Sequence, residues 1–363
     1  MKIFLDTNVF YNNWFIKNPN FKLMFRYLNN EKEDLLLSNL VIQEVENIRN
    51  RELDEATAEI DRQIKKVSKL NSGTLNYDKS LLNIKEYKLY DLVSEHVEYI
   101  DRIGYEKVPH CELVERAFIS KKPFSGQEKG YRDALIWLSF VDYLVENKIE
   151  GKVAFITNNK SDFFTVKGKA VSLHSDLLSD IKSRNIKAEV VPYLNLFDFV
   201  AKEIDKDEHL IDKMKLEHDL DSFLLEQTEE YLANLDKNSL SDLLGTNLFK
   251  DKITKILDSE CDTWDGVDDT SILHVSKLSD TEAYVSCQFI VTGIDLTVSI
   301  DEIEYNQHKD EIDSLIECYQ VVVDKENEIA KISLGFKAYV SGSLVFNTVI
   351  EEPTELNVED ISI

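Results

Sequence analysis

The apolar pattern of this chain changes its period partway along the length. In the first half, short apolar runs at residues 2–5, 35–37 and 153–156 alternate with stretches whose apolar residues recur at helical spacing. From Ser271 onward, apolar residues recur at every second position, as in residues 336–340. Strands that alternate with helices favour a parallel sheet, whereas successive period-two segments favour an antiparallel sheet.

This change of period predicts two folded domains. We expect residues 1–200 to form an α/β domain with a doubly wound parallel sheet. Residues 201–363 are expected to form an acidic domain, with a helical connector at 201–257 and an antiparallel β-rich (α+β) module at 258–363. A chain of 363 residues is long for a single core, because domains average about 150 residues.

Several elements of the first domain can be placed from the pattern. We expect long helices over about 39–70 and 130–147, and short additional strands of the sheet at 170–173 and 188–191. Residues 71–125 are expected to form two helices with loops, broken near Gly73, 104–109 and 121–126.

The charge of the chain is concentrated in its second part. The formal net charge is −26; residues 1–200 carry 29 Lys and Arg against 30 Asp and Glu, whereas residues 201–363 carry 13 against 38. Every arginine lies between Arg26 and Arg184, and arginine is the side chain best shaped to contact phosphate. Phosphate binding is therefore compatible with the first domain and disfavoured in the second.

The cysteines and the hydropathy bear on the compartment. The four cysteines have no C-x-x-C spacing, which argues against a zinc knuckle and a disulfide framework. There is no uninterrupted apolar run of the roughly 18 residues that a membrane helix needs. We expect a cytoplasmic protein that makes no contact with a membrane.

Four acids occupy positions from which a metal site can be built. Asp6 follows the first strand, Glu44 lies in the first turns of the next long helix, Asp133 is near the start of a later helix, and Asp162 follows the strand at 153–156. In an open α/β sheet, the carboxyl ends of strands and the N-termini of helices share one edge. Clustered carboxylates repel one another unless a cation joins them, and Mg²⁺ or Mn²⁺ prefers oxygen ligands.

The residues around these acids form an ordered set of motifs: I-F-L-D-T-N-V-F, V-I-Q-E-V-E-N-I, K-G-Y-R-D-A-L-I-W and A-F-I-T-N-N-K-S-D-F. Over about residues 1–200 this set resembles the PIN-domain family, the fold of many toxin ribonucleases and of some eukaryotic RNA-decay nucleases. About 55 residues between the Glu44 helix and Gly130 depart from the small toxin members. The chain is more similar to a larger bacterial PIN-like subgroup.

The resemblance implies a role for each motif residue. The catalytic metal-binding acids would be Asp6, Glu44, Asp133 and Asp162, with Mg²⁺ or Mn²⁺ as cofactor. The residues that support them would be Thr7, Asn8 and Asn159. The implied reaction is in-line attack of water on phosphorus, with cations stabilising the developing charge. By position alone, three basic residues are candidate phosphate contacts: Lys129, Arg132 and Lys160.

Each acid also has a purely structural interpretation. Asp6 can be a helix N-cap, Asp162 can cap a short helix, and Glu44 can be a solvated helix residue. Glu46 is the weaker candidate in its motif, because residues i and i+2 of a helix do not share a face.

The sequence supports three hypotheses for function. The first is a metal-dependent endoribonuclease that acts on RNA or single-stranded nucleic acid, with an acidic regulatory or partner-binding C-terminal module, in a toxin or anti-phage defence setting. The second is a non-catalytic PIN-like scaffold, and the third is a DNA flap-type nuclease. Period-two strands can pair at an edge, so the C-terminal domain is a candidate surface for a protein partner or a homodimer.

Overall fold

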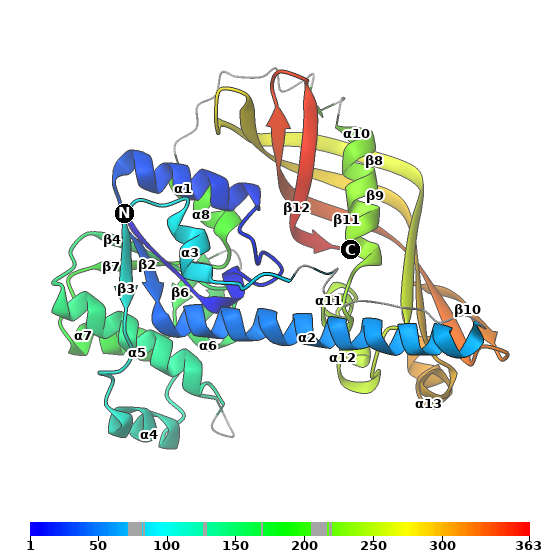
Figure 1. Ribbon diagram of the computed structural model, residues 1–363, viewed down its shortest axis with the longest axis horizontal. Coiled ribbons are helices and arrows are strands. Elements are labelled where there is room, and N and C mark those ends of the chain that lie inside the picture. The colour runs from blue at the N-terminus through cyan, green and yellow to red at the C-terminus, as the bar shows by residue number, and fades with distance from the viewer. Residues whose placement is uncertain (72–81, 83, 126–128, 168–169, 205–215, 218–219) are drawn as a thin grey trace. The chain divides into compact units, whose positions relative to one another are not determined.

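The computed structural model describes residues 1–71, 82, 84–125, 129–167, 170–204, 216–217 and 220–363, and the chain divides into two compact units, Met1–Ile204 and Asp205–Ile363 (Figure 1). The expected break at Gly73, and residues 205–215 of the expected helical connector, lie outside the described residues. None of the described helices is long and apolar enough to cross a membrane.

The N-terminal unit is built on a five-stranded sheet in the order β3-β2-β1-β4-β7, in which every pairing is parallel. The strands are β1 (Lys2–Leu5), β2 (Leu35–Ser38), β3 (Ile100–Ile103), β4 (Lys152–Ile156) and β7 (Glu189–Tyr193). The predicted doubly wound parallel sheet is confirmed. Because the chain builds outward from β1 in both directions, the carboxyl ends of β1 and β4 flank the point where the strand order reverses, which is where such sheets bind ligands.

Helices cover this sheet, and the long α2 is conspicuous among them in Figure 1. They are α1 (Pro19–Glu31), α2 (Asn39–Leu70), α3 (Leu89–Ser94), α4 (His110–Phe118), α5 (Tyr131–Glu146), α6 (Lys160–Phe163), α7 (Ser175–Ser183) and α8 (Leu196–Glu203), with a 3-10 turn η1 (Thr7–Val9) after β1.

An aromatic cluster fixes α5 on the centre of the sheet. Phe155 of β4 stacks on Phe4 of β1 with ring centroids 5.0 Å apart, and Phe140 and Trp137 of α5 lie 5.2 and 5.6 Å from Phe155. All four rings are fully buried. Aromatic packing of this kind contributes beyond the area it buries, and it places the start of α5 beside the carboxyl ends of β1 and β4.

Two strand assignments differ from the sequence pattern. The expectation of helices and loops alone across 71–125 is wrong at β3, because this edge strand reads I-D-R-I and lacks an apolar run. Residues 170–173 form a strand, β6 (Ala170–Leu173), but it pairs antiparallel with β5 (Phe164–Lys167) in a separate two-stranded sheet. Short strands of a hairpin and of a sheet have the same local pattern, so the sequence did not distinguish them.

The C-terminal unit carries an antiparallel sheet, as predicted from the period-two pattern, in the order β10-β11-β9-β8 with β12 also paired to β11. Its strands are β8 (Asp258–Lys277), β9 (Glu282–Asp301), β10 (Cys318–Asp324), β11 (Ile329–Asn347) and β12 (Glu352–Ser362). Its helices are α10 (Asp221–Ala233), α11 (Lys237–Leu243), α12 (Leu248–Lys252) and α13 (Glu302–Ile312).

One face of this sheet forms the core of the unit. Figure 1 shows α10 lying along β8 and β9, and Leu224 and Leu232 of α10 are fully buried in the same cluster as Ile294 and Leu296 of β9. Because side chains alternate along a strand, the residues between them, such as Asp295, face away from the helices.

Candidate functional site

The site begins where β1 and β4 end. The backbone N–H of Asp6 donates to the Ile156 carbonyl (3.1 Å), and the hydroxyl of Thr157, the residue after β4, donates to Asp6 Oδ2 (2.6 Å). Asp6 Oδ1 accepts from the Thr7 N–H (2.8 Å), which caps η1. The side chain is therefore both an N-cap and a fixed carboxylate, since only one of its oxygens serves the cap.

Thr7 and Asn8 connect this carboxylate to its surroundings. The Thr7 hydroxyl donates to Glu44 Oε2 (2.9 Å). The Asn8 amide donates to the Thr157 hydroxyl (3.1 Å) and its Oδ1 accepts from the Asn158 N–H (3.0 Å). Asn8 thus supports Asp6 through Thr157, and the Thr7 side chain supports Glu44. Thr157 is a site residue that the sequence alone did not indicate.

Glu44 is positioned by the start of α2. Ser38 caps this helix by accepting from the Leu40 N–H (3.2 Å), and Val41 and Val45 are fully buried on either side of Glu44. The Glu44 side chain is 12% exposed and forms an ion pair with Arg132. Glu46 points elsewhere: it accepts from the Leu89 N–H (2.9 Å) and so holds α3.

The other two acids meet through Asn159. The Asn159 amide lies 3.1 Å from Asp162 Oδ2 and 3.5 Å from Asp133 Oδ1. Asp162 is in the one-turn helix α6, which the fully buried Phe163 anchors. Its second oxygen accepts from Lys122 Nζ (3.1 Å).

The electrostatics show that the four carboxylates share one neighbourhood. The pKa of Asp6 is raised to about 7, mainly by burial and in addition by the charges of Asp133 and Glu44, against the opposing hydrogen bonds from Thr157 and Thr7. Burial also raises the pKa of Asp133, with added repulsion from Asp162 and Glu44. The structure thus brings all four predicted acids together, at a cost in like-charge repulsion.

The candidate phosphate contacts are placed unequally. Arg132 is 62% exposed and pairs with Glu44. Lys129, just before the N-cap of α5, and Lys160, the first residue of α6, are both exposed. Neither side chain makes an ion pair among the described residues.

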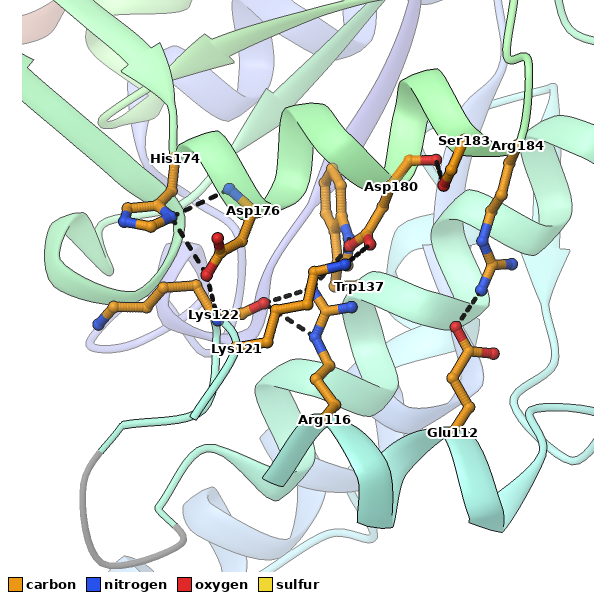
Figure 2. A network of polar contacts seen from close by, with 10 residues as sticks. All are labelled: Glu112, Arg116, Lys121, Lys122, Trp137, His174, Asp176, Asp180, Ser183 and Arg184. Atoms are coloured by element: carbon orange, nitrogen blue, oxygen red, sulfur yellow. Dashed lines mark hydrogen bonds and ion pairs between the residues drawn. The ribbon is translucent and has the colours of Figure 1, made fainter. Parts of the chain in front are cut away.

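Lys122 is a site residue that the sequence did not indicate, and a partly buried network holds it in place (Figure 2). Its backbone N–H donates to Asp176 (2.9 Å), and its carbonyl accepts from Arg116 Nε (2.9 Å). The same segment packs closely against the start of α5 at Gly130. A Cβ at this position would lie 2.5 Å from the Pro123 carbonyl oxygen, and the φ of Gly130 is +101°, so only glycine allows this approach. Its partner Asp162 is 40 residues away, so no local pattern reveals the contact.

Asp180 is the centre of that network. Its carboxylate accepts from Arg116 (2.6 Å), Lys121 (2.5 Å) and the Trp137 indole N–H (2.9 Å), as Figure 2 shows. Burial alone would raise the pKa of Asp180, but these donors lower it below its usual value. The network ties α7 to α4 and α5 directly behind Lys122.

The donor chemistry fits a hard divalent cation. Asp6, Glu44, Asp133 and Asp162 supply only oxygen, as Mg²⁺ and Mn²⁺ prefer. Within the described part of the chain, no three Asp, Glu, His or Cys side chains are arranged so that they could hold a metal ion as they stand. Two acids are instead neutralised by protein cations, Glu44 by Arg132 and Asp162 by Lys122.

Comparison with known families adds one finding. Residues 3–163 match the family model described as PIN domain. No curated protein and no solved structure matches the chain. The matched range contains the four acids and Thr157, and it excludes the C-terminal unit.

Proposed function

We propose that this chain, whose residues 3–163 form a PIN domain, is a Mg²⁺- or Mn²⁺-dependent phosphodiesterase. PIN domains are generally metal-dependent nucleases, and we expect this one to cleave RNA or single-stranded nucleic acid internally. The observation that carries the proposal is the convergence of Asp6, Glu44, Asp133 and Asp162 where β1 and β4 end, with Asp6 buried and its pKa raised to about 7. Four carboxylates brought together repel one another, and binding of a cation between them would relieve this repulsion.

The residues of the site divide the work. The four acids would hold the cation, which supplies charge stabilisation at the phosphoryl oxygens when bound. Thr157 and Thr7 orient Asp6 and Glu44, and Asn159 spans Asp133 and Asp162. Arg132 and Lys122, which neutralise two of the acids in the structure, would turn to phosphate oxygens once the acids hold a cation.

The direct test is cleavage of labelled single-stranded RNA, single-stranded DNA and a DNA flap by the full chain. We expect RNA to be cut internally in Mn²⁺ or Mg²⁺ and to stay intact in EDTA, with activity restored when Mn²⁺ is added back. Preferential cutting of the flap would identify a DNA nuclease on the same fold. Cleavage that continues in EDTA would contradict the proposal.

A toxin or defence role can be tested in cells. If the chain is a toxic ribonuclease, its expression in a bacterial host should arrest growth, and the Asp133→Asn variant expressed at the same level should not. Equal toxicity of the two proteins would show that growth arrest does not depend on the nuclease site.

A non-catalytic scaffold is the second candidate function, and the ion pairs favour it. Arg132–Glu44 and Lys122–Asp162 neutralise half of the acids without a metal, as they would in a site that has become structural. A scaffold predicts no rise in melting temperature on addition of Mn²⁺ and no cleavage of any substrate in the panel. The nuclease predicts a rise in melting temperature on addition of Mn²⁺ and cleavage of at least one substrate.

Lys122 provides a separate test of the site. Lys122→Met removes a charge that competes for Asp162 and a phosphate contact, so cleavage should fall by about 10- to 100-fold, as expected for one lost charge-assisted hydrogen bond. Binding of Mn²⁺, measured by calorimetry, should become tighter. Lys182→Met is the matched control, since Lys182 is an exposed lysine of α7 that forms no ion pair among the described residues; it should change neither quantity by as much.

A further inference from the structure

The outer face of the C-terminal sheet carries a hollow of about 530 Å³ that no part of the proposed nuclease function uses. Its lining comes from β8, β9, β10 and β11 and includes Trp264, Gly293, Asp295, Tyr319, Gly335 and Lys337. It combines two exposed aromatic rings with a carboxylate.

The aromatic rings are seated on glycines. Trp264 is 78% exposed, yet its indole lies so close to Gly293 that a Cβ there would fall 2.8 Å from the ring, and Gly293 has a φ of +67°. Tyr319 is 57% exposed and lies against Gly335, where a Cβ would fall 3.2 Å from its ring. Glycine at these positions allows backbone and ring to approach closely. Large aromatic side chains fixed in position but open to solvent are typical of binding hot spots.

Asp295 supplies the polar group of this hollow. One carboxylate oxygen accepts from the Tyr319 hydroxyl at 2.5 Å, and the other is buried without a hydrogen-bond partner among the described residues. No basic side chain in the described part of the chain forms an ion pair with it. Lys337 also lines the hollow, but its Nζ lies over the Tyr339 ring, 5.1 Å from the centroid. A buried carboxylate oxygen without a partner is costly unless something compensates it.

We propose that this hollow binds a cationic side chain, an arginine in a basic segment of a protein partner. A guanidinium group stacks flat on indole and phenol rings and at the same time donates to a carboxylate, which an ammonium group does less well. Residues 201–363 carry 38 Asp and Glu against 13 Lys and Arg, so the surrounding field attracts a basic segment and repels nucleic acid. The inference is independent of cleavage by the N-terminal unit.

The test uses the full chain and a fluorescein-labelled peptide of alternating arginine and serine, titrated by fluorescence anisotropy. A peptide with citrulline in place of arginine has nearly the same shape and no charge. We expect the arginine peptide to bind and the citrulline peptide to bind at least about tenfold more weakly. Equal binding of the two peptides, or no binding of either, would overturn the proposal.

Variants localise the binding. Trp264→Ala and Asp295→Asn should each weaken the arginine peptide by at least about tenfold. Asp280→Asn is the control for net charge, because Asp280 is 95% exposed at the β8–β9 turn, the opposite end of that hairpin from Asp295. Equal weakening by Asp280→Asn would show a diffuse charge effect and refute the pocket.

Two further measurements keep the result interpretable. Tyr319→Phe preserves the ring and removes the hydroxyl bond to Asp295, so this variant should fold and bind the peptide. It provides the test if Trp264→Ala proves unstable. Failure of a folded Tyr319→Phe to bind counts against the stacking role of the ring. Sedimentation of wild type and Trp264→Ala tests another occupant. If only the wild type self-associates, the hollow is an interface between copies of this chain and the proposal is wrong.

Discussion

Replacing Asp6 by asparagine is expected to abolish cleavage and, in the same protein, to raise the free energy of unfolding of the metal-free state in mildly alkaline buffer. Cleavage should fall by more than about 100-fold, which is the upper range for losing a group that only supports a metal ligand. Loss of cleavage together with a gain in stability is the result expected for a buried carboxylate that serves function at a cost to the fold.

The stabilisation follows from the pKa of this carboxyl. Its pKa rises from 3.8 to about 7 on folding, mainly because the group is buried. Between these values the folded state binds the proton more tightly than the unfolded state, so stability falls as pH rises through this window and the loss is complete above about pH 7. Asparagine carries no charge to desolvate and should recover roughly 2–4 kcal/mol there.

Urea unfolding at several pH values, with EDTA present, measures this effect. The wild type should lose stability from about pH 4 to pH 7 relative to Asp6→Asn, and added Mg²⁺ or Mn²⁺ should stabilise the wild type only. Asp91→Asn, a change at an exposed acid in the first turn of α3, controls for charge. An Asp6→Asn variant less stable than wild type above pH 7 would show that the carboxylate is stabilising and that its proposed repulsion is absent.

The sequence was informative where local pattern and function coincide. The buried run of β1 followed directly by Asp6-Thr7-Asn8, and the capped start of α2 that carries Glu44, are both local features that the structure bears out as elements. The order of the four acid-bearing motifs identified the PIN domain. Their convergence follows from parallel topology, which places the ends of β1 and β4 side by side.

What the sequence left out depends on long-range contacts. Strand β3 lies at the edge of the sheet and carries Asp101 and Arg102 at its centre, so it lacks the apolar run that would mark a strand. Thr157 and Lys122 meet Asp6 and Asp162 across 151 and 40 residues, and a Thr-Asn-Asn turn or a Lys-Lys pair carries no trace of such partners. The neutralisation of Glu44 by Arg132 was hidden for the same reason, and it changes the expectation from a vacant cluster of acids to a partly compensated one.

The largest expected loss of stability comes from Asp180→Ala. The substitution leaves Arg116, whose side chain is 3% exposed, as a buried charge, and it also removes the acceptor of the Trp137 indole N–H. Breaking one partner of a buried ion pair costs about 3–5 kcal/mol. Glu112→Ala is the matched control: it removes one partner of Arg184, but both side chains are partly exposed and the expected cost is about 1 kcal/mol or less.

The pH dependence separates this loss from simple truncation. Because the pKa of Asp180 is lowered in the fold, its contribution is present above the pKa of the unfolded state and is lost as pH falls through the folded value. Urea unfolding should therefore show a large gap between wild type and Asp180→Ala at neutral pH that narrows in acid. A gap that stays constant down to acid pH would mean that packing, rather than the charge on Asp180, holds α7 against α4. Lys122 is fixed to the same network. If wild type and Asp180→Ala were equally stable at neutral pH, the network would therefore not explain why Lys122 lies beside Asp162.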